Sequence, residues 1–309
     1  MAQPSQAILR LEAAISAPRE TVPIDLLREL WRHDEVVLVC ARPNDMEDQP
    51  DLPLRIRGAL GNALEQDRFA LGKARDPFDR EHAHELLYDW RPPLVEGPDG
   101  KTELAVPSVL IASMLGDRIE IRLRLFGRAG IHAPKIAKAL VAAVENGVSL
   151  RNHAIRVPLA PMSLDIERFE GAAQLWELAA GTAVVRLDTP LVIRSGGRIR
   201  LEPASLLRSA VRRAAALAPW MGVALGVDSK GLGEAIERVR AELAIHPEKW
   251  TRTSRRDPGR EIPVAGYGGT VRLSGPLAPL LPYLQLARYG NLGGQCAMGF
   301  GAITLICYP

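Results

Sequence analysis

Hydrophobic and polar positions along the chain follow two different periods, and these periods predict alternating strands and helices. In the segment 118–126, RIEIRLRLF, charged and apolar residues alternate strictly, as in a strand with one buried and one solvated face. In the segment 132–146, Ile136, Leu140 and Val144 recur at helical spacing. Segments of both kinds follow one another along the chain. The pattern therefore predicts an α+β fold.

The first half of the chain shows the order β-α-β-β-α-β. Its expected strands and helices, in chain order, are 36–40, 54–66, 105–112, 118–126, 132–146 and 155–166. The polar stretch 67–101 interrupts this pattern and is interpreted as an inserted loop. The order of elements is that of a ferredoxin-like unit.

The second half repeats the plan. Its expected strands are 182–193, 264–273 and 300–307, and its expected helices are 204–220, 279–289 and an additional one at 230–243. A polar and basic excursion follows at 249–260. We therefore expect two ferredoxin-like (RRM-like) βαββαβ units in tandem. The first spans residues 1–170 with the inserted loop, and the second spans 171–309 with a basic hairpin and a glycine-rich loop.

Composition indicates a folded globular protein, because 47% of the residues are apolar and 24% are charged. No apolar run approaches the roughly 18 residues of a membrane span, and the N-terminus does not show the pattern of a signal peptide. The three cysteines, Cys40, Cys296 and Cys307, form no CxxC pair. We therefore expect a cytoplasmic protein with no membrane partner, no bound metal and no cofactor.

Charge is unevenly distributed along the chain. Residues 186–260 hold 15 Lys+Arg against 8 Asp+Glu, a net charge of +7, which leaves 24 against 28, or −4, for the other residues. Nearly all of these cations are arginines, whose planar guanidinium suits bidentate phosphate contacts and stacking on bases. This polarity predicts a nucleic-acid-binding face. Scattered solvated arginines are the alternative explanation.

The most informative segment is 290–301, GNLGGQCAMGFG, which holds five glycines in twelve residues. Glycines allow the backbone to approach a partner closely and leave main-chain N–H groups to meet phosphates. A dinucleotide-binding fingerprint is excluded, because its glycines would follow a strand and open a helix, and the order here is the reverse. The alternative is a tight structural loop.

Four segments resemble the CRISPR repeat-processing endoribonucleases of the RAMP superfamily. They are LRIRGALGNAL at 54–64, TPLVIRSGGRIRLEPASLLRSAVRRAAALA at 189–218, KWTRTSRRDPGREIPVAGYGGTV at 249–271 and PLAPLLPYLQLARYGNLGGQCAMGFGAITL at 276–305. Fuller versions of that family often carry a cysteine cluster after the first helix. This chain has none there, which suggests a divergent subtype without a metal.

The resemblance implies an endoribonuclease that binds CRISPR repeat RNA and cleaves precursor crRNA. Cleavage would proceed by metal-independent general acid/base attack of the ribose 2′-OH, and the enzyme would retain the crRNA and work with other CRISPR effector subunits. The alternative is a non-catalytic RAMP-type subunit that binds crRNA in an effector complex. An RNA-binding module outside CRISPR is a further alternative.

The resemblance also implies candidate catalytic residues in or shortly after the first helix. This stretch holds His82, His84 and Tyr88, although EHAHELLY is equally the start of a polar helix. His33, just before the first strand, and Arg57, on the first helix, are further candidates. An imidazole suits acid/base work near neutral pH, and an arginine can supply positive charge to the phosphorane.

The candidate RNA-binding residues fall into four groups: the first helix, the strand end and helix after 190, the basic excursion, and the glycine-rich loop. They are Arg55, then Arg194, Arg198, Arg200, Arg208, Arg212 and Arg213, then Lys249, Trp250, Arg252, Arg255 and Arg256, and finally Gly293, Gly294 and Gln295. Trp250 either stacks on a base or pins the hairpin to the core.

Overall fold

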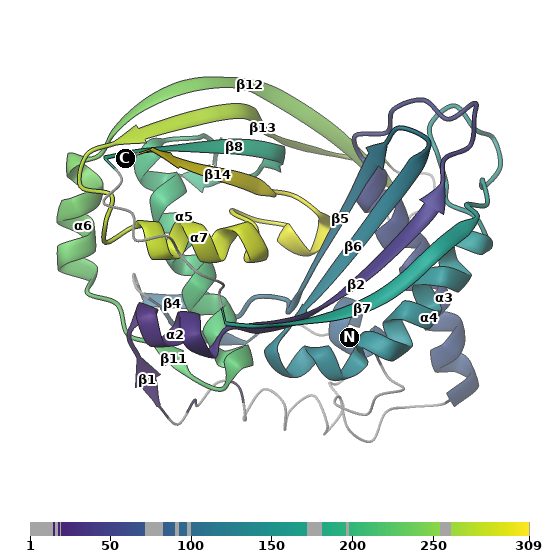
Figure 1. Cartoon of the computed structure of the whole chain (residues 1–309), viewed down its shortest axis with the longest axis horizontal. Helices are drawn as coiled ribbons and strands as arrows, with labels where there is room; N and C mark the ends of the chain where they lie inside the picture. Colours follow the sequence, from purple (N-terminus) through teal and green to yellow (C-terminus); the bar gives the residue numbers. More distant parts are fainter. Residues whose placement is uncertain are drawn as a thin grey trace. The chain divides into compact units, whose positions relative to one another are not determined.

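The computed structural model describes Ile15, Pro18 and residues 20–71, 83–89, 93–97, 100–171, 181–195, 198–253 and 261–308. The chain forms two compact units, each built on a four-stranded sheet (Figure 1). Unit 1 comprises the described parts of Met1–Ala17, Arg32–Pro93 and Val106–Phe169. Unit 2 comprises the described parts of Pro18–Trp31, Leu94–Ala105 and Glu170–Pro309.

The sheet of unit 1 has the strand order β5-β6-β2-β7. Its elements in chain order are β2 (Arg32–Ala41), α3 (Leu52–Leu71), β5 (Ser108–Leu115), β6 (Arg118–Phe126), α4 (Ala133–Glu145) and β7 (Pro161–Glu170). Helices α3 and α4 cover one face of the sheet, where Val36, Leu38, Ile121 and Leu123 are buried (Figure 1). This is the strand order of a ferredoxin-like unit.

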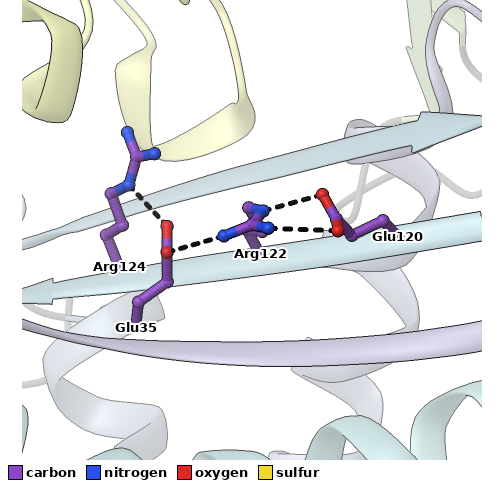
Figure 2. A network of polar contacts seen from close by, with 4 residues as sticks. All are labelled: Glu35, Glu120, Arg122 and Arg124. Atoms are coloured by element: carbon purple, nitrogen blue, oxygen red, sulfur yellow. Dashed lines mark hydrogen bonds and ion pairs between the residues drawn. The ribbon is translucent and has the colours of Figure 1, made fainter. Parts of the chain in front are cut away.

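Charged residues on the other face of this sheet pair with one another. Arg122 Nη1 and Arg124 Nε donate to Glu35 at 2.9 and 2.7 Å, and Arg122 also donates to Glu120 at 2.7 and 3.1 Å (Figure 2). The Glu35 side chain is only 3% exposed, so these donors replace its lost hydration. The hydrogen bond to Glu120 raises the pKa of Arg122. The face that the alternating pattern predicts to be solvated is therefore a partly buried ion-pair network.

The sheet of unit 2 has the equivalent order β12-β13-β8-β14. Its elements in chain order are β8 (Thr182–Leu191), α5 (Pro203–Leu217), α6 (Ser229–Arg238), β12 (Arg240–Thr253), β13 (Glu261–Ser274), α7 (Leu281–Gly290) and β14 (Ile303–Tyr308). Helices α5 and α7 lie on one side of the sheet (Figure 1). The predicted fold class, α+β with tandem ferredoxin-like units, is confirmed.

The prediction of a helix at 230–243 in unit 2 is wrong for its last residues. The expected helix 230–243 ends as α6 at Arg238, and β12 begins at Arg240. The segment RAELAIH has good helix formers, but it alternates with a period of two and pairs with β13 along its length. Tertiary pairing overrides helix propensity here. The described part of the basic excursion, residues 249–253, is the end of β12.

Several boundaries in unit 1 also differ from the expected ones. Helix α3 runs past the expected end at residue 66, and the last strand is Pro161–Glu170 where 155–166 was expected. Val148 and Val157 form an isolated bridge, so the residues before β7 close a turn and are not part of the strand. The stretch expected as an inserted loop holds the π-helix η1 (Glu85–Asp89) and the strands β3 (Leu94–Gly97) and β4 (Gly100–Glu103).

Two segments from the first half of the chain lie in unit 2. Strand β1 (Thr21–Val22) pairs in parallel with β11 (Ala224–Leu225), and α2 (Ile24–Leu30) follows it. Ala105 N–H donates to Ala216 O at 3.1 Å, and the Trp220 indole N–H donates to Ala105 O at 2.8 Å. The core of unit 2 therefore needs residues far away in the sequence.

The remaining elements are short. They are β9 (Arg194–Ser195), β10 (Arg198–Ile199) and the 3-10 turns η2 (Gly127–His132), η3 (Ala218–Met221) and η4 (Cys296–Met298). Of the helices in the described ranges, none has the length and apolar character needed to cross a membrane.

Candidate functional site

The expected catalytic residues His84, Tyr88 and Arg57 lie together on the surface of α3. Gly61 gives the Tyr88 ring room to pack, because a Cβ there would lie 2.9 Å from Tyr88 Cε1. The Tyr88 hydroxyl donates to Arg57 O at 2.7 Å, and Arg57 Nη2 donates to Leu87 O at 2.9 Å. The Arg57 guanidinium lies 4.4 Å from the centre of the Tyr88 ring, and the His84 ring stacks on that ring at 5.2 Å.

The hydrogen bonds and ring contacts of this cluster already engage the side chains that acid/base catalysis would need. His84 is 2% exposed, and the Tyr88 hydroxyl donates to a backbone carbonyl. Arg57 and Tyr88 are both partly exposed, whereas His84 is buried. His82 lies outside the described residues.

His33 lies apart from this cluster, on β2. Its ring stacks on Phe169 of β7 at 4.8 Å and is 3% exposed. Burial, with a smaller effect from the Arg124 charge, lowers the pKa of His33 to about 4. The imidazole is therefore neutral at physiological pH, and unit 1 does not bring it together with His84.

Arg55, an expected RNA-binding residue, takes part in a network that joins two loops to α3. Its guanidinium donates to Asp51 Oδ2 at 3.0 Å and to Ser149 O at 2.8 Å. Arg151 Nη2 donates to the same Asp51 oxygen at 3.2 Å. Since Asp51 is fully buried, its carboxylate depends on these two arginines, and RNA would compete with Asp51 and Ser149 for Arg55.

The arginines after residue 190 occupy a short hairpin and the helix that follows it. Arg194 begins β9 and Arg198 begins β10; Arg194 and Arg200 are exposed, and the backbone alone is described for Arg198. Arg200 Nε lies 3.0 Å from Glu202 Oε1. On α5, Arg208 and Arg212 are exposed at helical spacing. These arginines all belong to unit 2, and their contact with phosphate stays a prediction.

Arg213 differs from its neighbours on α5, because its side chain is only partly exposed. Its Nε donates to Gly290 O, the last residue of α7, at 2.7 Å. The expected phosphate contact would therefore require an arginine that already caps a helix.

The basic hairpin is formed by β12 and β13. Lys249 is exposed on β12, and only the backbone is described for Arg252. Arg255 and Arg256 lie outside the described residues. Trp250 is 4% exposed and packs against Phe300 at 4.7 Å. Of the two roles considered for Trp250, this geometry matches the one that pins the hairpin to the core.

Two backbone amides of the glycine-rich loop already have hydrogen-bond partners elsewhere in unit 2. Gly293 N–H donates to Ser209 Oγ at 2.8 Å, and Gly294 N–H donates to Val192 O at 2.8 Å. These two amides, expected to meet phosphates, are therefore already paired. Gly293 has φ of +77°, and a Cβ there would collide with Val192 O. Gln295 has φ of 62°, a left-handed conformation that is unusual for a residue with a side chain.

Sequence reasoning missed Ser209 and Thr189, which hold this loop. Thr189 Oγ1 donates to Gly299 O at 2.7 Å and accepts from Ala302 N–H at 2.9 Å. A lone hydroxyl gives no signal in a sequence, because its role depends on a partner about 80 to 110 residues away. In the described ranges, no three His, Cys, Asp or Glu side chains converge as metal ligands do.

Part of unit 2 matches a family model. Residues 185–303, from β8 to the start of β14, match the model of the CRISPR-associated endoribonuclease Cas6. The match includes the β9–β10 hairpin, α5, the basic hairpin and the glycine-rich loop. A search of curated proteins by sequence gave no match.

Solved Cas6 structures share the fold. Thermus thermophilus Cas6 (TTHB231) superposes with a TM-score of 0.53 at 13% identity, covering 89% of this chain and 99% of that one. The product complex of Cas6 (TTHA0078) has a TM-score of 0.52 at 17% identity, covering 90% and 100%. The substrate mimic complex of the same protein has 0.51 at 19% identity, covering 89% and 99%. The match over residues 185–303 and this shared fold confirm the resemblance to the CRISPR repeat-processing endoribonucleases that the sequence shows.

Proposed function

We propose that this protein binds CRISPR repeat RNA and cuts precursor crRNA within its repeats. The observation that carries the proposal is the family match over residues 185–303, because it falls on the part of the chain with the largest excess of arginine and on the glycine-rich loop. Exposed cations on α5 and on the β9–β10 hairpin supply the electrostatic attraction that RNA requires.

The proposed reaction is metal-independent. A general base removes the proton of the ribose 2′-OH, the 2′-oxygen attacks the adjacent phosphorus, and the bond from phosphorus to the 5′-oxygen breaks. A general acid protonates the leaving 5′-oxygen. The products are a 2′,3′-cyclic phosphate and a 5′-OH end, and nearby positive charge stabilises the phosphorane.

Acid/base catalysis is assigned to the segment that holds His82, His84 and Tyr88, with Arg57 as the source of positive charge. Arg57 lies on α3, and His84 and Tyr88 belong to the segment that packs on it; Glu85–Asp89 is a π-helix, a form often found at functional sites. His84 is buried without RNA, so its action requires this segment to move when RNA binds. Catalytic hydrogen bonds often form only in the complex.

The partners proposed for the protein are repeat RNA, crRNA and other subunits of a CRISPR effector complex in the cytoplasm. Structures of Cas6 (TTHA0078) with a product and with a substrate mimic have the same fold as this chain. A product complex is also known for Cas6 (TTHB231). Retention of the cut crRNA is the corresponding proposal for this protein.

The function is tested by incubating the purified protein with its cognate repeat RNA in EDTA and mapping the product ends. We expect cleavage at one position with a 5′-OH and a cyclic phosphate. Loss of cleavage in EDTA with rescue by Mg²⁺ would contradict the metal-independent reaction.

A second candidate function is a non-catalytic subunit that binds crRNA. The burial of His33 and His84 favours it, because neither ring reaches solvent in the protein without RNA. It predicts that the protein binds repeat RNA tightly and leaves it intact under every condition in which binding is measured.

A further inference from the structure

We infer that Ser209 and Arg213 of α5 are positioning residues that hold the glycine-rich loop in its RNA-binding conformation. The inference rests on the proposed function, which gives that loop a role in RNA binding. The two residues lie four positions apart, so they share one face of the helix. Each makes a hydrogen bond to the chain between α7 and the loop.

The two bonds fix the end of α7 and the start of the loop. Arg213 Nε donates to Gly290 O at 2.7 Å, and Ser209 Oγ accepts from Gly293 N–H at 2.8 Å. A guanidinium at a helix C-terminus satisfies an end carbonyl and opposes the negative end of the helix dipole. A third residue on the same face, Leu217, lies so close that a Cβ on Gly290 would be 2.8 Å from its Cδ1.

The end of β8 holds the loop from another direction. Gly294 N–H donates to Val192 O at 2.8 Å, and Gly301 N–H donates to Pro190 O at 3.0 Å. Between these anchors, Gly294 is exposed and Gln295 adopts the left-handed conformation. Such a conformation costs a side-chain-bearing residue about 1 kcal/mol and persists only where its surroundings enforce it. The anchors on α5 and those at the end of β8 together therefore fix how Gly294 and Gln295 are presented.

This role differs from direct phosphate binding by Arg213. If Arg213 contacted a phosphate, its loss would reduce the slope of log affinity against log salt by about 0.7 to 0.9. A positioning residue lowers the affinity by the same factor at every salt concentration. Arg208, exposed on the same helix, is the matched control for a residue positioned to contact phosphate.

The experiment measures binding of repeat RNA with a 2′-deoxy nucleotide at the cut site, which blocks cleavage, over a range of KCl concentrations. We expect Ser209→Ala and Arg213→Met to weaken binding at least about fivefold with an unchanged salt slope, and Ser209→Thr to restore it. Arg208→Ala should flatten the slope. Because both α5 residues act through one loop, the double variant should lose less than the product of the two single losses.

Cys296 reports the loop conformation without RNA. Its thiol is buried and donates to Leu292 O and Gly293 O at 3.4 and 3.2 Å. With the partly exposed Cys307 changed to serine, we expect Arg213→Met to speed the reaction of Cys296 with a disulfide reagent several-fold. Loss of the Arg213 charge alone would raise the pKa of this thiol and slow the reaction, so a faster reaction reports an opened loop.

Two outcomes overturn the inference. One is wild-type RNA affinity in both Ser209→Ala and Arg213→Met. The other is a flattened salt slope in Arg213→Met with unchanged Cys296 reactivity, which would make Arg213 a phosphate ligand. If Arg213→Met does not fold, the pair Ser209→Ala and Ser209→Thr decides. If the wild type itself fails to bind repeat RNA, the proposed function fails, whereas the thiol reaction still shows whether α5 holds the loop.

Discussion

Packing partners separate the candidate catalytic histidines in a way that neither residue type nor burial does. His33 and His84 have the same side chain and similar burial, yet one stacks on Phe169 in a sheet and the other on Tyr88 beside a helix. The sequence indicates that imidazoles are present near the first helix. It does not indicate that their rings pack inward, because short polar segments such as EHAHELLY show no clear period.

The role assigned to His84 is tested by His84→Gln. We expect single-turnover cleavage to slow by at least about 10²-fold with little change in RNA affinity, because acid/base catalysis acts in the transition state. Tyr88→Phe keeps the ring that stacks on His84 and removes only the hydroxyl, so it serves as the matched variant. If His84→Gln slows cleavage only as far as it lowers the free energy of unfolding, His84 has a packing role.

His33 should make stability depend on pH. Its pKa is about 4 in the folded protein against an ordinary 6.5, so the unfolded chain takes up the proton first as pH falls. The stabilisation by the neutral ring is complete above pH 6.5 and is lost as pH falls towards 4. It amounts to about 3 kcal/mol at most.

Denaturant unfolding of the wild type and His33→Gln between pH 7.5 and 4 measures this effect. The variant should be less stable at neutral pH and should lose less stability on acidification. Parallel pH profiles would show that the ring titrates normally.

Gly293 and Gly294 should respond differently to alanine, although they are neighbours. Gly293 has a positive φ and its Cβ would collide with Val192 O, so Gly293→Ala should lower the melting temperature. At Gly294 a Cβ would lie 3.6 Å from the same oxygen, an ordinary contact. Gly294→Ala should keep the fold and weaken RNA binding where the backbone meets RNA closely. Wild-type RNA affinity in Gly294→Ala would make the loop purely structural.

At the scale of elements, periodicity predicts most of the strands and helices, and long-range pairing accounts for the failures. The alternating segment 118–126 is β6 with the expected bounds, and 132–146 is α4 with a shift of one residue at each end. The start of β12 has the composition of a helix, because Ala, Glu and Leu favour helices, and its pairing with residues of β13 about 30 positions further along the chain decides for a strand. The glycine-rich loop was found from composition, but its anchors were not.

The basic hairpin should bind RNA through its charges and keep its shape through Trp250. Arg252→Ala, Arg255→Ala and Arg256→Ala should each reduce the salt slope of RNA binding by about one where a phosphate contact is lost. Trp250→Ala should instead destabilise the protein by about 3–5 kcal/mol, because it removes a buried indole from Phe300. Filter binding over a salt series and denaturant unfolding separate the two effects, and unchanged slopes in all three arginine variants would place the RNA elsewhere.

At the scale of the whole molecule, the two units are not two consecutive parts of the chain, because each combines three separate stretches of it. A cut after residue 170 leaves the sheet of unit 2 intact but removes Pro18–Trp31 and Leu94–Ala105 from it. The sequence predicts the duplicated sheets because each repeats one pattern. A segment as short as Thr21–Val22 has no sequence pattern that predicts its pairing with Ala224–Leu225, and only the folded structure shows it.

The fragment 171–309 should therefore be unstable alone. Without Ala105, the Trp220 indole N–H loses its acceptor in a buried site, and loss of a buried partner costs about 1–3 kcal/mol before any lost packing is counted. We expect no cooperative thermal transition for this fragment, and a cooperative one when the fragment 1–170 is added. Calorimetry checks this, and a sharp transition for 171–309 by itself would contradict it.

The pairing of β1 with β11 has a consequence for protein synthesis. Thr21 emerges from the ribosome about 200 residues before its partner Ala224, an interval of roughly 10–40 s at 5–20 residues per second. Throughout this time Leu27 and Trp31, buried in the finished protein, have no native neighbours from the second half of the chain. Contacts of such long sequence separation also form slowly. The core of unit 2 can therefore form only after β11 has been synthesised, and until then nascent chains expose this apolar segment to chaperones.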